Sequence, residues 1–221
     1  FLMRNNLAYT KSLFLYALKK NARFINASSA STYGDGSLGF ADDVHALNDL
    51  RPLNMYGYSK HLFDLWAARQ GHLDSLVSLK FFNVYGPNEQ HKDDMRSMVN
   101  KAFFQIGETG AMRLFRSDRS EYADGGQMRD FVYVKDCVGS TWWLLENRDV
   151  NGIFNIDTGV ALTWKDLATA VFVAMKHPVN IGYVDMPALL AGKSHEFTQT
   201  RMERMADDGS TVPHTTHGQG T

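Results

Sequence analysis

Tyr56 and Lys60 form a Tyr-x-x-x-Lys element at the point where a helix is expected to begin. Residues four apart on an α-helix share one face about 6 Å apart along its axis, so the Lys60 ammonium and the Tyr56 hydroxyl are expected to face one cleft. An unperturbed tyrosine titrates near pH 10, and about 4 kcal/mol of preferential stabilisation makes a phenolate available near pH 7. A cation about 4 Å away supplies roughly that amount at an effective dielectric constant of about 20, before desolvation is subtracted. The pair therefore indicates acid–base chemistry on a substrate hydroxyl.

Ser28 and Ser29 follow an apolar run over residues 24–27 that is typical of a buried strand. Open α/β sheets bind ligands beyond the carboxyl ends of their strands, where a Ser29 hydroxyl would donate to a reacting hydroxyl or ketone oxygen. An isolated Ser-Ser-Ala segment is more typical of a turn whose serines bond their own backbone. Because Ser29 precedes Tyr56 and Lys60 within an α/β pattern, we expect it to belong to the same site.

The elements expected around these residues alternate between strand and helix. Apolar runs predict strands over residues 24–27, 76–82, 131–134, 153–156 and 180–183, and helices over residues 6–20, 56–70, 95–106, 135–146 and 164–175. This alternation predicts the α/β class, with a Rossmann-like doubly wound parallel sheet that carries helices on its faces. Trp142, Trp143 and Trp164 lie in the helical runs, and we expect them in the core.

Residues 34–39 match the Gly-x-Gly-x-x-Gly pattern of dinucleotide-binding loops. In such a loop the glycines join a strand to the helix whose N-terminus binds the pyrophosphate. Here the expected strand ends several residues earlier, and residues 40–52 are rich in Asp and Asn and end in a proline where a packed helix would run. The pattern is therefore interpreted as a Gly-rich surface turn.

Composition argues against several classes of partner. The 221 residues carry a formal net charge of −1, whereas nucleic acids and membrane surfaces usually demand a basic face. No signal peptide and no apolar run of about 18 residues occurs, so a cytoplasmic location is expected. The single cysteine, Cys137, excludes an internal disulfide and lies in an apolar helical run, where packing is its expected role. No metal is expected, because His214 and His217 lack a third ligand nearby.

The order Ser29, Tyr56, Lys60 resembles that of the extended short-chain dehydrogenase/reductase family of nucleotide-sugar enzymes, over residues 1 to about 204. The resemblance implies that all three residues are catalytic and that Lys60 also binds the nicotinamide ribose. It implies oxidation of a sugar hydroxyl by a nicotinamide cofactor, after which the transient ketone is altered and reduced again. NADP is the expected cofactor, with NAD as the alternative.

Local sequence narrows the reaction. Dehydratases that resemble this chain place Asp-Glu directly after the catalytic hydroxyl, where this chain has Ala30 and Ser31, so dehydration is not expected. Residues 81–92 read Phe-Phe-Asn-Val-Tyr-Gly-Pro-Asn-Glu-Gln-His-Lys and resemble a segment of the ADP-L-glycero-D-manno-heptose 6-epimerases, as do residues 122–134 and 196–199. The resemblance implies inversion of C6 of an ADP-heptose, a lipopolysaccharide precursor, through a 6-keto intermediate. Another nucleotide-sugar epimerase, of the UDP-hexose 4-epimerase type, stays open as an alternative.

Lys92 ends the first of these segments, and the resemblance implies that it is a catalytic base opposite Tyr56 that also contacts the cofactor. Inversion through a ketone requires the proton and the hydride to be handled on both faces of the carbon, so a second base is useful. Taken alone, residues 91–94, His-Lys-Asp-Asp, are more typical of a solvated charged loop.

The resemblance also implies the binding residues. Asn5 and Val84 are expected to contact the cofactor, and Asn83, Phe115 and Arg129 the substrate. Arginine suits a diphosphate because its guanidinium donates bidentately. A surface ion pair with the aspartate that follows it is the alternative for this arginine.

The chain is expected to begin inside the family's fold, with the first βαβ units missing. Residues 1–82 are expected to be the C-terminal part of the Rossmann domain, and residues 83–206 a mixed substrate-binding region with returning Rossmann elements at about 128–150. Residues 207–221 are expected to be a disordered or truncated tail. The expected partners are an ADP-heptose and further copies of the chain in a homo-oligomer. A non-catalytic cofactor-binding protein or an inactive fragment is the alternative of a different class.

Overall fold

The computed structural model describes residues 1–117, 120 and 122–185, and its centre is a three-stranded parallel sheet. The strands β1 (Ile25–Ser29), β2 (Val77–Phe81) and β6 (Gly152–Ile156) lie in the order β1-β2-β6, and Leu79 pairs with Ala27 on one side and Phe154 on the other. The first four residues of β2 are buried. Burial along a whole central strand is typical of a parallel sheet that is covered on both faces.

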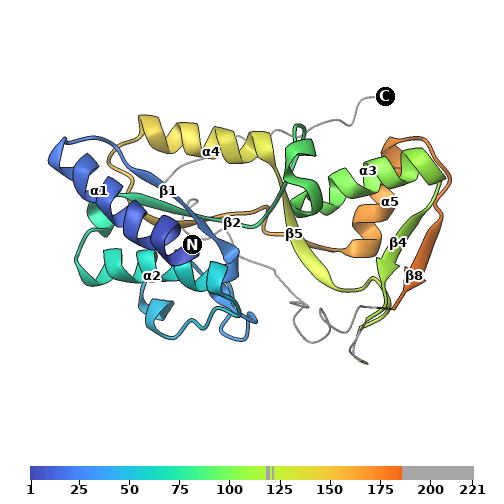
Figure 1. The fold of residues 1–221 in the computed structure, drawn as a ribbon, viewed down its shortest axis with the longest axis horizontal. Helices are drawn as coiled ribbons and strands as arrows, with labels where there is room; N and C mark the ends of the chain where they lie inside the picture. Colours follow the sequence, from blue (N-terminus) through green and yellow to red (C-terminus); the bar gives the residue numbers. More distant parts are fainter. Residues whose placement is uncertain (118–119, 121, 186–221) are drawn as a thin grey trace.

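Helices lie on both faces of this sheet (Figure 1). A π-helical segment, Met3–Tyr9, leads into α1 (Thr10–Lys19), which packs with α2 (Met55–Arg69) through a cluster that contains Phe14 and Phe63. On the opposite face, α4 (Val134–Glu146) places Cys137 and Leu144 in a cluster with Leu79. The arrangement is that of a doubly wound sheet.

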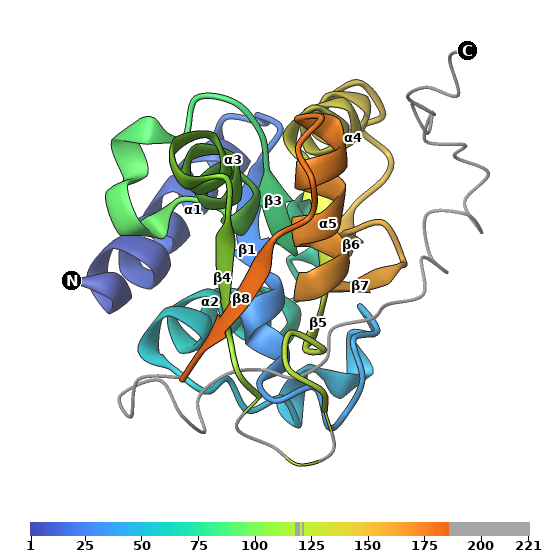
Figure 2. The same ribbon diagram turned by 90° about the vertical axis from the view of Figure 1, so that its right-hand side faces the viewer.

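A smaller region lies beside the sheet, on the right of Figure 1. It contains α3 (Met98–Thr109) and α5 (Trp164–Ala174), which share a buried cluster with the parallel pair β4 (Met112–Phe115) and β8 (Ile181–Val184). Figure 2 shows β4 and β8 side by side. Between this region and the central sheet, β5 (Met128–Tyr133) pairs in parallel with β3 (Asn83–Tyr85) and antiparallel with β7 (Ala161–Thr163).

The structure confirms the expected α/β class and the Rossmann-like parallel sheet. Each expected strand and helix has a counterpart, but the start expected for the helix over residues 95–106 is wrong. A 3-10 helix occupies Gln90–Met95, and α3 begins at Met98 because the Ser97 hydroxyl accepts from the Asn100 N–H over 3.2 Å. The strands β3, β4 and β7 were not predicted, since runs of three or four residues show no clear period.

The structure agrees with two further expectations, on residues 34–39 and Cys137, and contradicts a third, on Trp142. Residues 34–39 form turns, as expected, and Gly34 has a φ of 69° with its Cα facing the Arg51 carbonyl, where a Cβ would lie 2.1 Å from the oxygen. Cys137 is buried, and burial raises the pKa of its thiol to about 12. The core position expected for Trp142 is wrong, because 60% of this residue is exposed.

The proposed division into residues 1–82, 83–206 and 207–221 stays a prediction. The last of these segments, the two histidines expected not to bind metal, and the matched residues 196–199 all lie outside the described residues. Within the described part of the chain, no helix is long and apolar enough to cross a membrane.

Candidate active site

Ser29 is the last residue of β1 and lies at the carboxyl edge of the central sheet. Its hydroxyl oxygen accepts from the Ser31 N–H over 3.2 Å and from the Ser31 hydroxyl over 2.9 Å, and so caps the 3-10 helix Ala30–Tyr33. The serines therefore do form the local turn that the sequence left open as an alternative. In both of these bonds Ser29 acts as an acceptor, so they leave its own proton for a substrate oxygen.

Tyr56 and Lys60 lie in the first two turns of α2, as the sequence predicts. The helix starts there because the Asn54 side chain accepts from the Gly57 N–H over 2.8 Å. The Lys60 Nζ atom lies 5.9 Å from the centre of the Tyr56 ring, and Tyr56 is 42% exposed. The two side chains therefore share a face of the helix, with the phenol open to a ligand.

Lys60 also reaches back to the central sheet. Its ammonium donates to the Ala27 carbonyl oxygen over 2.7 Å, which ties the start of α2 to the middle of β1. Burial lowers the pKa of Lys60 from its ordinary value, and the nearby Asp64 charge opposes this shift. One of the three ammonium donors is used by the carbonyl, and the other two are available to ligand oxygens.

A buried polar network lies beneath this dyad, and sequence reasoning missed it. The fully buried Asp64 carboxylate accepts from the Ser28 hydroxyl over 2.6 Å and from the Ser78 hydroxyl over 2.5 Å. Burial raises the pKa of Asp64, while the Lys80 charge and the two serine hydroxyls act against this shift. The available signal was the position of Asp64 one helical turn after Lys60, on the same face.

Lys80 completes this network in the centre of the sheet. It is 1% exposed, and its Nζ atom lies 3.9 Å from the centre of the Tyr33 ring, while the Tyr33 hydroxyl donates to Asn155 Oδ1 over 2.6 Å. Burial lowers the pKa of Lys80 to about 8, against the opposing charges of Asp64 and Asp42. From the sequence, Lys80 was interpreted only as one residue of the strand predicted over residues 76–82, with no role of its own.

Three residues expected in the site line one cavity of about 150 Å³: Ser29 from β1, Asn83 from β3 and Arg129 from β5. The Asn83 amide donates to the Asp130 carbonyl oxygen over 2.9 Å, which fixes the side chain between β3 and β5. The fold thus brings together residues that are widely separated in sequence. Ser29 ends β1 and Asn83 follows the carboxyl end of β2, as the α/β pattern predicts, whereas Arg129 lies near the start of β5.

A second cavity of about 340 Å³ is also lined by Asn83, together with Val84 and with Arg96, Ser97 and Lys101. The last three belong to the segment that carries Lys92 and to the start of α3. Asn83 therefore stands between the cavity of Ser29 and the cavity of the Lys92 segment.

Arg129 packs its guanidinium carbon 5.9 Å from the centre of the Trp164 ring, and its Nη1 atom donates to the Met128 carbonyl oxygen over 2.7 Å. The Asp130 carboxylate accepts from the Thr158 N–H and from the Val160 N–H, which closes the turn between β6 and β7. The carboxylate that the sequence offered as an ion-pair partner thus has a structural role of its own.

Five expected residues do not line either of these cavities: Asn5, Tyr56, Lys60, Lys92 and Phe115. Phe115 is the last residue of β4, is 40% exposed, and is not among the described residues that line either cavity. Asn5 lies exposed in the π-helical segment before α1, where its carbonyl oxygen accepts from the Thr10 hydroxyl over 3.4 Å. Its neighbour Asn6 donates to the Ser59 hydroxyl over 3.0 Å and attaches this segment to α2.

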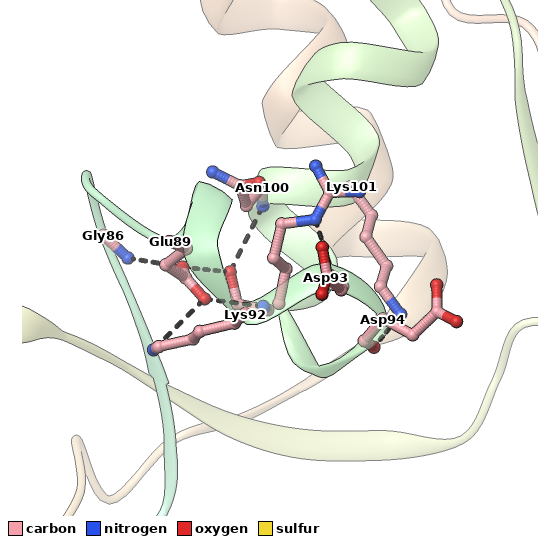
Figure 3. A network of polar contacts seen from close by, with 9 residues as sticks. Gly86, Glu89, Lys92, Asp93, Asp94, Asn100 and Lys101 are labelled. Carbon is pink, nitrogen blue, oxygen red and sulfur yellow. Dashed lines mark hydrogen bonds and ion pairs between the residues drawn. The ribbon is translucent and has the colours of Figure 1, made fainter.

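Lys92 lies in the 3-10 helix after β3, and its side chain is 46% exposed (Figure 3). Its Nζ atom lies 3.6 Å from Glu89 Oε2. The segment is therefore more than a solvated charged loop, because a buried carboxylate contacts the lysine. Glu89 was not singled out from the sequence. Among the described residues, no group of three or more His, Cys, Asp or Glu residues is arranged to hold a metal ion.

Comparisons with known proteins identify relatives of this chain. Residues 2–157 match the family described as the NAD dependent epimerase/dehydratase family. A protein of Nitratidesulfovibrio vulgaris strain DP4 named ADP-L-glycero-D-manno-heptose-6-epimerase is 62% identical over 212 residues, which cover 96% of this chain and 66% of that protein. A protein of the same name from Fusobacterium nucleatum is 44% identical over 220 residues, with 96% and 66% covered. The chain thus spans about two thirds of the length of these relatives.

Solved structures are similar as well. The ADP-L-glycero-D-manno-heptose-6-epimerase of Helicobacter pylori has a TM-score of 0.76 at 26% identity, over 93% of this chain and 59% of that one. The Thermus thermophilus UDP-glucose 4-epimerase in complex with NAD has a TM-score of 0.70 at 21% identity, over 92% and 63%. The second likeness concerns the fold alone.

Proposed function

The chain belongs to the NAD dependent epimerase/dehydratase family, and from this premise we propose that it inverts C6 of ADP-D-glycero-D-manno-heptose to give ADP-L-glycero-D-manno-heptose. The two relatives that carry the name of this enzyme support the proposal, the first at 62% identity. The extent of their identity favours this substrate over the UDP-hexoses of other family members. The retained Ser29, Tyr56 and Lys60 favour an active enzyme over a non-catalytic relative.

One geometric observation supports the proposal. Asn83 lines both the cavity that contains Ser29 and the cavity next to the Lys92 segment. A sugar held at Asn83 would therefore lie between Ser29 at the end of β1 and the segment after β3 that carries Lys92. Inversion of a carbon requires groups on two sides, whereas simple oxidation requires a base on only one.

We assign proton transfer at the C6 oxygen to Tyr56 and Lys92. Tyr56 accepts the hydroxyl proton as the alcohol becomes a ketone, with Ser29 donating to the same oxygen. The Lys60 ammonium stabilises the phenolate electrostatically from the next turn of α2. After the ketone has turned within the site, Lys92 carries out the proton transfer at the C6 oxygen on the opposite face.

The donor set of the site fits a nicotinamide cofactor, with NADP as the proposed form. Lys60 keeps two ammonium donors for the ribose hydroxyls after its bond to the Ala27 carbonyl. Val84 and Lys92 are the further residues assigned to it on the side of β3, and Asn5 on the side of α1. When bound, the nicotinamide supplies reversible hydride transfer at C6.

Arg129 is the residue we assign to the diphosphate of the substrate. It lines the cavity of Ser29 and Asn83, and its planar guanidinium suits two phosphate oxygens at once. Asn83 is assigned to the sugar or to the diphosphate. Phe115, on β4, is assigned to the ADP end, where the ring would stack on the adenine if the substrate extends along this strand.

Two further proposals concern the assembly and location of the protein. Exposed apolar side chains on and before α1 favour a homo-oligomer that buries them: Tyr9, Leu13, Leu15, Tyr16 and Leu18. A cytoplasmic location agrees with the single unpaired cysteine.

The test is interconversion of the two ADP-heptose epimers by the protein in its full natural length, followed by chromatography that separates them. We expect an equilibrium mixture from either epimer with NADP present, and conversion at least about 10²-fold slower by Tyr56→Phe. Competition with UDP-hexoses decides between substrates. Conversion of UDP-glucose to UDP-galactose without conversion of the ADP-heptoses would replace the proposal with the 4-epimerase alternative.

A further inference from the structure

Glu89 occupies the centre of the segment that carries Lys92 (Figure 3). Its side chain is 5% exposed, and its carboxylate accepts from the Gly86 N–H over 3.2 Å, the Ser97 N–H over 2.7 Å and the Ser97 hydroxyl over 2.6 Å. Gly86 lies directly after β3, and Ser97 is the N-cap of α3. One carboxylate therefore joins the two ends of the segment between these elements.

The same carboxylate contacts the lysine. Glu89 Oε2 accepts from the Ser97 N–H and lies 3.6 Å from Lys92 Nζ, one turn along the 3-10 helix. Burial alone would raise the pKa of Glu89, but the hydrogen bonds from Ser97 and Gly86 and the Lys92 charge bring it below its ordinary value. Glu89 is therefore an anion at neutral pH, with the Lys92 amine beside it.

Two basic side chains hold the backbone of the segment. Arg96 Nε donates to the Asp93 carbonyl oxygen over 2.8 Å, and Lys101 Nζ donates to the Asp94 carbonyl oxygen over 2.7 Å. Asp93 itself has a φ of 46°, a left-handed conformation that non-glycine residues rarely adopt. Such backbone persists only where the surrounding contacts fix it. The segment is therefore held in one shape.

We propose that Glu89 is a positioning residue for Lys92, and that it fixes the amine of this lysine through its carboxylate while it fixes the segment through Gly86 and Ser97. The inference rests on the proposed function, in which Lys92 is the second base. A lysine side chain is long and flexible, and an ammonium offers no directional preference of its own. A buried carboxylate at its side limits the positions that the amine occupies, and a well-placed base transfers protons faster.

The variant that tests this inference is Glu89→Gln. Glutamine keeps the shape of the side chain, and its oxygen still accepts from the Ser97 N–H, while the Ser97 hydroxyl turns to accept from the new amide. The Gly86 N–H loses its partner, and Lys92 loses its counter-charge. Asp94→Asn is the matched control, because it removes one negative charge from the same segment at an exposed residue whose side chain points away from Lys92 (Figure 3).

The first measurement needs no enzyme activity. Competitive labelling of amines with acetic anhydride, read by mass spectrometry, compares Lys92 with the exposed Lys19 in the same molecule. Loss of the counter-charge in Glu89→Gln is expected to speed labelling of Lys92 about two- to fivefold, and about 1 M salt is expected to remove most of the difference between variant and wild type. Asp94→Asn is expected to label like the wild type. Equal labelling of Lys92 in Glu89→Gln and wild type overturns the inference.

The second measurement separates positioning from support of the fold. Glu89→Gln is expected to lower kcat about tenfold with KM nearly unchanged, and to cost less than about twofold when Lys92 is already methionine. An equal cost in both backgrounds means that Glu89 acts on the segment as a whole, and overturns the inference. If the wild type does not interconvert the ADP-heptoses, the proposed function fails, while the labelling still decides whether Glu89 holds Lys92.

Discussion

The Ser28 hydroxyl donates to the buried Asp64 carboxylate over 2.6 Å, and this bond joins the end of β1 to the middle of α2. The residue after Ser28 is the expected catalytic serine, and the helix that carries Asp64 also carries Tyr56 and Lys60. The relative position of Ser29, Tyr56 and Lys60 therefore depends on a contact that includes none of them, in addition to the bond from Lys60 to the Ala27 carbonyl.

Asp64→Asn is the first prediction. The amide keeps the shape of the carboxylate but removes its charge from between Ser28, Ser78 and Lys80, so the free energy of unfolding is expected to fall by about 2 kcal/mol. Chemical denaturation measures this change. Asp74→Asn, at an exposed aspartate, is expected to change it by less than about 0.5 kcal/mol. Equal stability of the two variants would show that the buried network contributes little.

Tyr56→Phe tests the phenol. Loss of one positioned proton-transfer group is expected to lower kcat by about 10²- to 10⁴-fold, while the midpoint of thermal unfolding stays within a few degrees because Tyr56 is 42% exposed. Tyr58→Phe is the matched control, since Tyr58 lies in the same helix at 37% exposure. A similar loss of kcat in both variants would remove Tyr56 from its proposed role.

Arg129→Lys tests the proposed diphosphate contact. The change keeps a positive charge but removes the planar fork that donates to two oxygens, so KM for the ADP-heptose is expected to rise about tenfold with a smaller effect on kcat. Steady-state kinetics with both epimers measures the two constants. Arg148→Lys, at an exposed position in the turn after α4, is expected to leave them unchanged. A loss confined to kcat would contradict a binding role for Arg129.

The buried Lys80 predicts how the free energy of unfolding depends on pH. In the folded protein the pKa of Lys80 is about 8, against about 10.5 for a free lysine. Between these values the unfolded chain holds a proton that the folded chain has released, so stability rises with pH, by at most about 1.4 kcal/mol per unit. Denaturation between about pH 7.5 and pH 9 is expected to show this rise in the wild type, and Lys80→Met is expected to lack it. An equal rise in the variant would assign it to other groups.

The site residues that could be predicted are those whose residue types and order in the chain indicate their role. Ser29 lies at the end of a strand, and Tyr56 and Lys60 lie at the start of a helix. The alternating pattern was enough to predict both elements. Glu89, Asp64 and Lys80 could not be found in this way. Each owes its importance to burial beside a charged or hydroxyl group that lies elsewhere in the chain or in a non-repetitive turn, and burial of this kind follows only from the packed structure.

The same reasoning explains the strands that were not predicted. A strand of three or four residues, such as β3 (Asn83–Tyr85), contains too few positions to show alternation, and it forms because β5 offers a partner. The late start of α3 has a comparable cause. Ser97 caps α3, and its N–H and hydroxyl both donate to the Glu89 carboxylate, a contact that no local pattern contains.

The strand order β1-β2-β6 bears on how the chain folds. The central strand β2 finds one neighbour before it in the chain, but the other, β6, pairs Gly152 with Val77 only after the intervening segments have been made. Loop closure over such a separation is entropically costly, so this pairing is expected to form late. During synthesis on the ribosome, the side of β2 that will meet β6 therefore stays open until residue 156 has emerged. The helix α3 and the strand β4 lie within that interval, and both are thus made before the central sheet is closed.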